Sequence, residues 1–291
     1  MAKRYDPKMA KLLAACCELA YVQYNRGSFK PPKGYSVAGS FEAPDTPFRS
    51  QLGRLKFRLL KFILKFFDLT RASTAVVEYV DYFFQKPFGF ALRSDAGTHA
   101  IVAFRGTQDL ADWVTDIDAF QVPLPPAWRG QIPSGDGIRV HLGFLLLSLQ
   151  LHKQVLAALD RVDKKAPVYV TGHSLGGALS VLTSLMLKLH GFEDVRMYSF
   201  AGPRAGNREF AAAYNGLVPA SYRVVNLCDV VPEVPPSRLD NWTYEHVGQA
   251  WSFLNQSGDV VGNHGINAPN NYLAAVNAGV PTDKRRKFPS K

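Results

Sequence analysis

The chain has 291 residues, of which 47% are hydrophobic, and it carries a formal net charge of +10. This length can bury a sizeable core within one domain, and no apolar run approaches the roughly 20 residues that would cross a bilayer. Nine of the basic residues lie in two groups, and without them the chain is almost neutral. The positive charge is therefore local, which excludes the broad positive field of a nucleic-acid-binding protein. The two groups are Arg54, Lys56, Arg58, Lys61 and Lys65, and Lys284, Arg285, Arg286 and Lys287.

The beginning of the chain predicts a helix and makes a poor secretion signal, because Glu18 interrupts the short apolar stretch after Lys11. The apolar residues at helical spacing are Met9, Leu12, Cys16, Leu19 and Ala20. The three cysteines, Cys16, Cys17 and Cys228, have neither metal-ligand nor disulfide spacing, so we expect buried thiols. We therefore expect a cytoplasmic or membrane-peripheral chain, although a removed signal or another export route stays open.

Residues 26–50 are rich in Gly, Pro and Ser and predict a loop with one short strand. Residues 52–71 predict a basic amphipathic helix, which supports two interpretations. It can lie on an anionic membrane or lipid-droplet surface, or it can pack its apolar side on the domain and leave the basic side solvated. Lys56 interrupts the apolar side and favours the second. The basic side holds Arg54, Arg58, Lys61 and Lys65, and the apolar side Leu55, Leu59, Phe62, Ile63 and Phe66.

From residue 74 to 104 the pattern is that of strands, and residues 88–93 and 99–104 predict a hairpin. Residues 108–118 could form a short helix, 121–138 a loop, and 140–159 a longer helix. Strands are then expected at 167–171, 195–200 and 222–227. Strands that alternate with helices of ten to fifteen residues imply crossover connections and a largely parallel sheet, so the fold class is α/β.

The segment around Ser174 organises the rest of the chain. A short buried strand at Val168 to Val170 leads through Gly172-His-Ser-Leu-Gly176 directly into an alanine- and leucine-rich helix. Such a turn leaves no room for side chains at the flanking positions, which explains the glycines. It lifts one hydroxyl above the sheet edge, and we therefore expect Ser174 to be a nucleophile rather than a simple helix cap.

A serine nucleophile needs a base, and the base needs a carboxylate that orients it. Asp229 follows an apolar strand and is the expected carboxylate, while Asp240 and Asp259 are weaker alternatives because neither ends a clear core strand. His264 lies in a glycine-containing loop from which an imidazole could reach the serine. His246 is the alternative base, but its alternating neighbours predict a structural residue in a strand.

Acyl transfer also needs hydrogen-bond donors for the developing oxyanion. We expect the backbone N–H of Leu175, at the start of the helix after the serine, to be one donor. Thr107 follows the strand at 99–104 and offers both an N–H and a hydroxyl, so it is the expected second donor. The alternative role for Thr107 is a turn residue that caps the segment after Gly106.

Six short motifs follow one another along the chain. They are Phe104-Arg-Gly-Thr107, Val140-His-Leu-Gly-Phe144, Gly172-His-Ser-Leu-Gly-Gly177, Phe200-Ala-Gly-Pro-Arg-Ala-Gly-Asn207, Asp229-Val-Val-Pro232 and His246-Val-Gly248. In this order they resemble the motifs of class 3 lipases, a fungal-type family, and the resemblance covers roughly residues 75–275. The resemblance implies an α/β-hydrolase fold, a triad of Ser174, Asp229 and His264, and an oxyanion hole of Thr107 and Leu175. It also implies structural roles for His141 and His246 and a mobile lid over residues 108–118, with Leu110, Trp113, Val114 and Ile117 as its apolar residues.

We therefore expect one α/β-hydrolase domain over residues 1–280 and a basic, disordered tail over 281–291. The expected activity is that of a triacylglycerol lipase that works through an acyl-serine and needs no cofactor or metal. A soluble carboxylesterase and a phospholipase A1 could use the same three residues, and a non-enzymatic lipid-binding protein is a remote alternative. Acyl length, head group and oligomeric state do not follow from the sequence.

Overall fold

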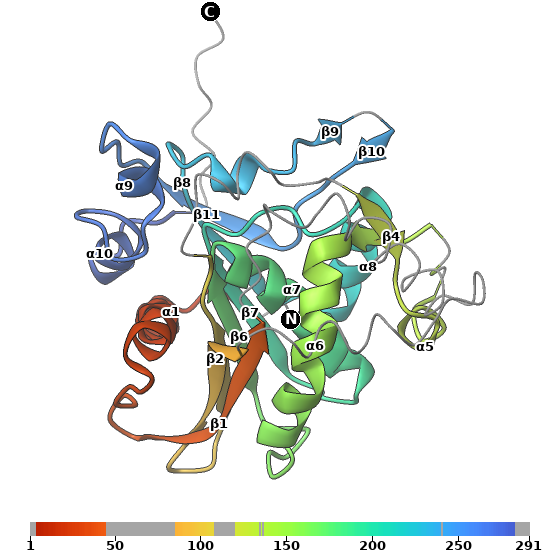
Figure 1. Ribbon diagram of the computed structural model, residues 1–291, viewed down its shortest axis with the longest axis horizontal. Helices are drawn as coiled ribbons and strands as arrows, with labels where there is room; N and C mark the ends of the chain where they lie inside the picture. The colour runs from red at the N-terminus through yellow and green to blue at the C-terminus, as the bar shows by residue number, and fades with distance from the viewer. Residues whose placement is uncertain are drawn as a thin grey trace, which may run out of the picture.

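A seven-stranded sheet forms the centre of the computed structural model (Figure 1). Its strands are β1 (Tyr35–Pro44), β2 (Gln85–Ser94), β3 (Ala100–Phe104), β6 (Val168–His173), β7 (Val195–Phe200), β8 (Ser221–Asn226) and β11 (Gln249–Phe253). They lie in the order β1-β2-β3-β6-β7-β8-β11. The pairs from β3 to β11 are parallel, while β1, β2 and β3 are joined antiparallel. This confirms the predicted α/β class, the mostly parallel sheet and the hairpin before residue 104.

The structure describes residues 4–44, 85–107, 120–133, 135, 137–239 and 241–282. The basic helix expected at 52–71, the lid expected at 108–118 and residues 283–291 of the expected tail lie outside these ranges. In the described ranges no helix is both long enough and apolar enough to cross a membrane.

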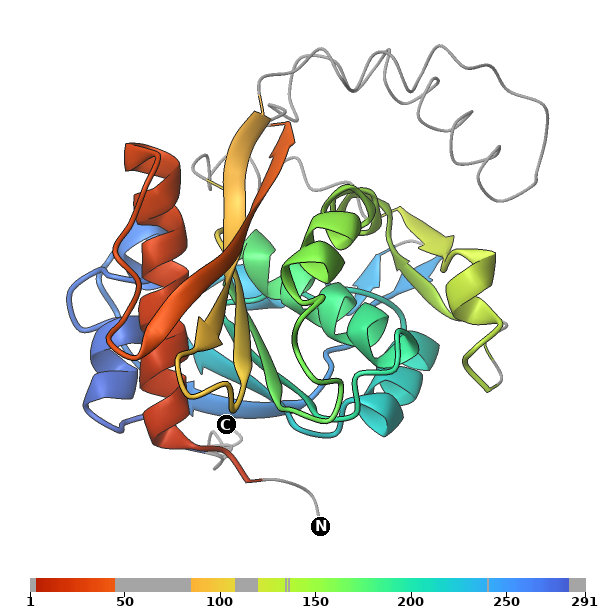
Figure 2. The same cartoon turned by 90° about the horizontal axis from the view of Figure 1, so that it is seen from below.

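Helices cover both faces of the sheet (Figure 2). On one face lie α1 (Pro7–Arg26) and α10 (Tyr272–Asn277); on the other lie α6 (Leu142–Ala158), α7 (Leu175–Leu189) and α8 (Arg208–Leu217). Alternate side chains of a strand serve the two faces. Val168 and Val170 accordingly pack into the core with α6 and α7, while Tyr169 packs into the core with α1.

The predicted first helix is α1. Asp6 caps its start by accepting hydrogen bonds from the N–H groups of Lys8 and Met9, and Pro7 occupies the first turn, where its missing N–H costs nothing. Gly27, with φ 74°, ends the helix in the left-handed conformation that glycine tolerates. Cys16 and Cys17 are buried as expected, but Cys228 is only half-buried, so the prediction of three buried thiols was wrong for Cys228.

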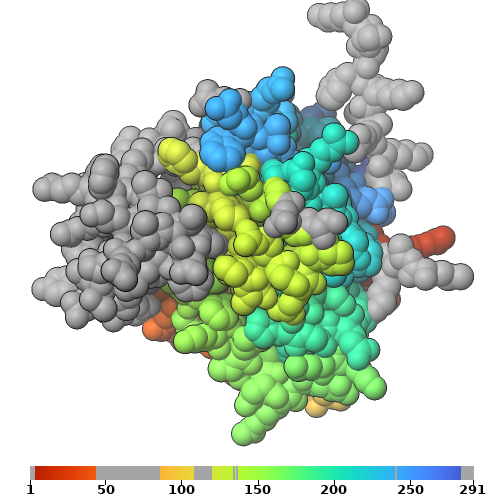
Figure 3. Space-filling model, turned by 90° about the vertical axis from the view of Figure 1, so that its right-hand side faces the viewer, coloured from red at the N-terminus to blue at the C-terminus, as the bar shows by residue number. Residues whose placement is uncertain are grey.

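Several short elements differ from the sequence prediction. The strand within 26–50 is longer than expected, since β1 has ten residues and pairs with β2 through two register shifts. Residues 121–138 contain β4 (Gln121–Pro123) and α5 (Pro126–Arg129), and β4 pairs with β5 (Arg139–His141). The 3-10 helix η1 (Val231–Glu233) and the hairpin of β9 (Arg238–Leu239) and β10 (Trp242–Thr243) follow β8. Figure 3 shows the β4–α5 segment beside this hairpin, and the Gln121 side chain donates a hydrogen bond to the Thr243 carbonyl at 2.7 Å.

The residues expected to act in chemistry lie at one edge of the sheet. Thr107 follows β3, Ser174 follows β6 and Asp229 follows β8, and these three parallel strands end at the same edge. Helices α9 (Val260–His264) and α10 come after β11 and return the chain to the end of β8. The topology therefore brings residues from four distant stretches to one place.

Candidate active site

Ser174 occupies a strained turn between β6 and α7. Its backbone has φ 58° and ψ −129°, a conformation that costs a non-glycine residue about 1–3 kcal/mol. Two backbone hydrogen bonds hold it, from Ser174 N–H to the Phe200 carbonyl at 3.0 Å and from Gly177 N–H to the Ser174 carbonyl at 2.8 Å. The strain is thus fixed by neighbouring strands and by the helix that follows.

The glycines around Ser174 are explained by close backbone contacts. A Cβ at Gly176 would lie 2.5 Å from the Arg105 carbonyl oxygen and 2.6 Å from that of Phe104, and one at Gly172 would overlap the backbone of Gly176. Real Cβ atoms do not approach so closely. The turn and the end of β3 can pack together only when these positions lack side chains, which agrees with the steric argument from the sequence.

His264 and Asp229 lie in direct contact. The distance from His264 Nδ1 to Asp229 Oδ2 is 2.8 Å, and both side chains are buried. Because a carboxylate oxygen only accepts, Nδ1 carries the proton and Nε2 keeps a free lone pair. The imidazole is therefore held in the tautomer that can take a proton from a hydroxyl.

Two further donors hold the Asp229 carboxylate. The Tyr272 hydroxyl donates to Asp229 Oδ2 at 2.6 Å, and Val231 N–H donates to Oδ1 at 3.0 Å. Burial, followed by the charge of Asp229, raises the pKa of Tyr272 well above its ordinary value, so the hydroxyl keeps its proton as a donor. Tyr272 was not predicted as a site residue, because nothing local in α10 indicates a contact with a residue 43 positions earlier.

Asn226, the last residue of β8, joins the loop that carries Asp229 to the loop after β11 and to α9, which carries His264. Its side-chain amide donates to the carbonyls of Asn255 and Asn263 at 2.9 and 3.0 Å, and its oxygen accepts from Asn255 N–H at 3.0 Å. The same oxygen accepts from Cys228 N–H at 3.2 Å. Asn226 was not predicted as a site residue either, although an asparagine at the end of a core strand is a polar signal that could have indicated it.

The serine and the imidazole each have one buried polar atom available. Among the described residues, neither Ser174 Oγ nor His264 Nε2 has a hydrogen-bond partner. The His264 ring centroid lies 4.6 Å from that of His173, the neighbour of Ser174, so the imidazole packs against the serine turn. His264 ends the short helix α9, which Asp259 caps, and the expectation that it lies in a flexible loop was wrong.

Of the two expected oxyanion donors, one directly follows Ser174 and the other lies in the loop after β3. Leu175 is the first residue of α7 and is buried. Thr107 is half-buried and follows Gly106, whose backbone is so close to the turn that a Cβ there would lie 2.6 Å from Ser174 Cβ. The loop after β3 therefore packs directly against the serine.

Three histidines outside the pair with Asp229 have other partners. His141 caps α6 by accepting from Phe144 N–H at 3.3 Å, and its ring stacks on the Phe144 ring. His246 lies outside the strands, contrary to expectation, and its Nε2 lies 2.7 Å from the Pro232 carbonyl, as for a hydrogen-bonded structural residue. His173, the neighbour of Ser174, contacts the Tyr21 hydroxyl through Nδ1 and the His264 carbonyl through Nε2. Asp240, an alternative carboxylate, lies outside the described residues.

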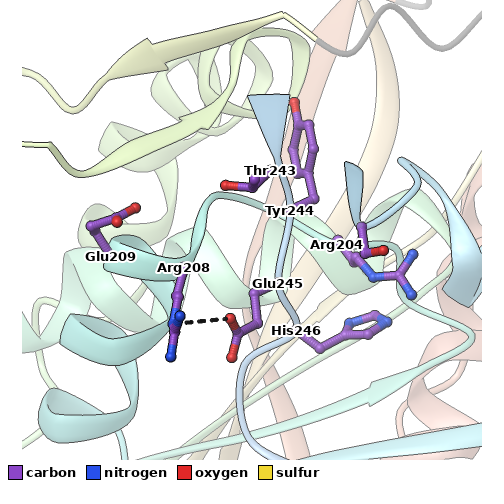
Figure 4. Close-up of a pocket in the computed structure, with 8 residues that line it drawn as sticks. Arg204, Arg208, Glu209, Thr243, Tyr244, Glu245 and His246 are labelled. Carbon is purple, nitrogen blue, oxygen red and sulfur yellow. Dashed lines mark ion pairs between the residues drawn. The ribbon is translucent and has the colours of Figure 1, made fainter. Parts of the chain in front are cut away.

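A pocket of about 510 Å³ lies between the start of α8 and the segment around and after β10 (Figure 4). It is lined by Arg204, Arg208, Glu209, Ser237, Thr243, Tyr244, Glu245 and His246. Arg208 Nε lies 4.0 Å from Glu245 Oε2, and Arg204 pairs with Glu233 at 2.6 Å. Because Ser174, Asp229 and His264 are not among its lining residues, this pocket is separate from the site at the sheet edge.

Comparisons with known proteins agree with this geometry. Residues 101–239 match the family model described as Lipase (class 3). The chain is 49% identical over 154 residues to a lipase of Caenorhabditis elegans, a match that covers 50% of this chain and 41% of the relative. It is 31% identical over 163 residues to phospholipase A1-II 3 of Oryza sativa subsp. indica, which covers 47% of this chain and 39% of the relative.

Among solved structures, the chain is similar to the mono- and diacylglycerol lipase from Aspergillus oryzae, with a TM-score of 0.61 at 19% identity. That likeness covers 91% of this chain and 85% of the other and concerns the fold. The chain spans about half the length of the curated relatives it matches. The similarity to class 3 lipases is therefore carried by residues 101–239, and the mostly parallel sheet with helices on both faces has the α/β-hydrolase fold.

Proposed function

We propose that this chain is a serine ester hydrolase, most simply a triacylglycerol lipase, that acts on lipid carboxylic esters through an acyl-serine at Ser174. The observation that supports this most is the buried contact between His264 Nδ1 and Asp229 Oδ2, beside a serine held in a strained turn. The class 3 lipase match and the relatives named as lipases support the same activity.

In the proposed reaction, His264 Nε2 takes the proton of Ser174 Oγ while that oxygen attacks the ester carbonyl carbon. The backbone N–H groups of Leu175 and Thr107 stabilise the negative charge on the carbonyl oxygen. The tetrahedral intermediate then expels the alcohol, which leaves with the proton from His264. Water, activated by the same imidazole, attacks the acyl-serine by the reverse route and releases the fatty acid.

The burial of the reacting atoms supports this assignment of roles. Ser174 Oγ and His264 Nε2 are both buried, and no other hydrogen bond in the described part of the chain occupies them. A buried polar atom without a partner is costly, by about 1–3 kcal/mol, and such atoms tend to persist at functional sites. Both atoms are therefore available for the proton transfer that ester cleavage needs.

A substrate panel tests the proposed activity. Native protein and the Ser174→Ala variant would be assayed on emulsified triacylglycerols, phospholipid vesicles and short nitrophenyl esters, with product acids quantified. Triacylglycerol hydrolysis that the variant lacks supports the lipase. Fatty acid release mainly from the first position of phospholipids would favour a phospholipase A1, the activity that the name of the rice relative gives to that protein.

The lid assignment stays a proposal from the sequence. Residues Leu110, Trp113, Val114 and Ile117 would cover the site in water and turn toward lipid at an interface. Activity should then rise sharply when the ester concentration exceeds its solubility limit. Equal rates per unit of dissolved and aggregated substrate would remove this part of the proposal.

Contact with an anionic membrane or lipid-droplet surface through Arg54, Arg58, Lys61 and Lys65 is likewise proposed from their spacing in the sequence. Neutralising all four should weaken binding to phosphatidylserine vesicles while hydrolysis of dissolved short esters continues. Unchanged vesicle binding would leave those residues as solvated surface charges. A cytoplasmic or membrane-peripheral location remains a prediction that fractionation of the producing cells would test.

A further inference from the structure

We propose that Tyr21 and His173 are positioning residues that couple the oxyanion loop to His264 across the serine turn. This inference rests on the proposed function and extends it. It adds to the site a residue of helix α1, which lies outside the part of the chain that matches the lipase model.

Three hydrogen bonds connect Gly106, Tyr21, His173 and His264 in that order, and together they form a hydrogen-bonded line. Gly106 N–H donates to the Tyr21 hydroxyl at 3.0 Å, the hydroxyl lies 2.9 Å from His173 Nδ1, and His173 Nε2 lies 2.8 Å from the His264 carbonyl oxygen. Gly106 precedes Thr107, the expected oxyanion donor. The line therefore starts at the residue before Thr107, the expected oxyanion donor, and ends on the backbone of His264, the proposed base.

The chemistry of the end groups fixes the direction of every bond. The His264 carbonyl can only accept, so His173 Nε2 must carry a proton. In a neutral imidazole Nδ1 is then an acceptor, so the Tyr21 hydroxyl donates to it and uses an oxygen lone pair to accept from Gly106 N–H. Burial, with a further contribution from His264, lowers the pKa of His173 well below its ordinary value, which keeps the ring neutral as this arrangement requires.

The packing around the Tyr21 hydroxyl leaves little alternative for the loop. A Cβ at Gly106 would lie 2.5 Å from the Tyr21 hydroxyl oxygen and 2.6 Å from Ser174 Cβ, so the loop is confined between the tyrosine and the serine turn. Without the hydroxyl, Gly106 N–H loses its acceptor and His173 Nδ1 loses its donor. The loop and the ring can then shift, and small displacements of donors cost much of their effect on a transition state.

A matched pair of tyrosine variants tests the proposal. Tyr21→Phe removes the hydroxyl from the line, and Tyr35→Phe removes a hydroxyl that also contacts a histidine, His99 Nε2 at 2.8 Å, at the opposite end of β3. On a dissolved short ester, Y21F should lower kcat by about tenfold or more and change KM little. Its affinity for phenylboronic acid, which forms a tetrahedral adduct with a serine, should fall by a similar factor. Y35F should resemble the native protein in kcat, in KM and in affinity for phenylboronic acid.

The melting temperatures of both variants are measured alongside. The positioning role of Tyr21 is supported if both variants lose the same stability but only Y21F loses kcat and boronate affinity. If kcat and boronate affinity of folded Y21F lie within twofold of native values, the proposal is overturned. Should Y21F not fold, two His173 variants decide the question instead.

His173→Gln places an amide donor where Nε2 lies, whereas His173→Ala removes both contacts of the ring. The proposal expects H173A to lose kcat at least as strongly as Y21F, and H173Q to recover part of it through the bond to the His264 carbonyl. Equal kcat in H173Q and H173A, at the same stability, contradicts a role in holding that carbonyl.

Failure of the proposed function is recognised separately. If the native chain hydrolyses no ester and Ser174 takes up no fluorophosphonate, the proposed ester hydrolase function is rejected. The hydrogen-bonded line through His173 is then tested by nitrogen-15 NMR of His173 in the native chain. A neutral ring with its proton on Nε2 supports the arrangement. A proton on Nδ1 overturns it whatever the activity.

Discussion

The Tyr272 hydroxyl and His264 Nδ1 contact the same oxygen of Asp229, Oδ2, at 2.6 and 2.8 Å. The hydroxyl also accepts a hydrogen bond from Asn226 N–H at 3.0 Å. A tyrosine from α10 thus links the end of β8 to the carboxylate that orients the imidazole. Asp229 is held from two sides, and the proposed base is held through it.

Tyr272→Phe should weaken both catalysis and folding. It leaves Asn226 N–H without its acceptor and removes one donor from a buried carboxylate, which together cost about 1–3 kcal/mol. We expect kcat on a soluble ester to fall by about tenfold, with little change in KM. The comparison is Tyr214→Phe, which removes a buried hydroxyl that contacts Ser221 Oγ at 3.1 Å. That variant should lose stability but keep kcat, and a kcat for Y272F equal to that of Y214F would contradict the role of Tyr272.

Gly176→Ala should distort the serine turn. Its Cβ would overlap the carbonyls of Phe104 and Arg105, so we expect a loss of about 1–3 kcal/mol of folding free energy and a strong loss of esterase activity. Gly216→Ala is the control, because no atom lies within 4 Å of a Cβ at that position in α8. It should stabilise the helix by about 0.5–1 kcal/mol and leave activity unchanged. Denaturant unfolding measures both, and a stable, active G176A protein would show that the turn is less confined than described.

Asn226→Asp tests the connection between the loops. The substitution keeps an oxygen for Cys228 and Asn255 N–H but loses the two amide donations to the carbonyls of Asn255 and Asn263. It also adds a negative charge three positions before Asp229. We expect a lower melting temperature and about a tenfold fall in kcat.

Asn215→Asp provides the matched change at an exposed site, where the side chain accepts from Gly248 N–H at 2.7 Å. It should leave the melting temperature and kcat close to native values. Equal effects of the two asparagine variants would show that Asn226 has no special role in joining the loops.

Stability should fall in mild acid because His173, which is buried, and His246, which is half-buried, are both held as neutral rings. Burial, together with His264 for His173 and with Arg223 and Arg204 for His246, lowers both pKa values well below 6.5. Below about pH 6.5 the unfolded chain binds protons that the folded chain does not, so the free energy of unfolding falls by about 1.4 kcal/mol per pH unit for each such histidine. Above about pH 6.5 both rings are neutral in the folded and in the unfolded chain, so they do not make the free energy of unfolding depend on pH.

Denaturant unfolding between pH 7.5 and 5 measures this slope. His246→Gln keeps a donor for the Pro232 carbonyl but cannot titrate, and it should reduce the slope by the contribution of one proton. An identical slope in the native chain and H246Q would show that His246 is protonated in the folded protein.

Much of the fold could be predicted because its signals are local. Apolar strands followed by turn residues placed Ser174, Asp229 and Thr107 after β6, β8 and β3, and the glycines of the serine turn indicated its close packing. Secondary structure was less predictable where it depends on distant pairing. Residues 35–44 belong to the stretch 26–50, which is rich in Gly, Pro and Ser, and they form a strand because β2 pairs with them. Helix α9 is only five residues long, too short for a periodic pattern.

The interior of the candidate site could not be predicted for the same reason. The contacts of Tyr21 with Gly106 and His173 and of Tyr272 with Asp229 join residues 85, 152 and 43 positions apart. A tyrosine on an amphipathic helix has an ordinary packing role in any sequence pattern. Only the three-dimensional arrangement shows which hydroxyls face histidine and carboxylate groups.

Mass spectrometry after reaction with a fluorophosphonate tests the central claim, that Ser174 is a nucleophile activated by His264 and Asp229. The account predicts one label per native chain, located on Ser174, complete loss of ester hydrolysis on labelling, and neither label nor turnover in Ser174→Ala. A label on another residue, or normal turnover by the Ser174→Ala variant, would contradict it.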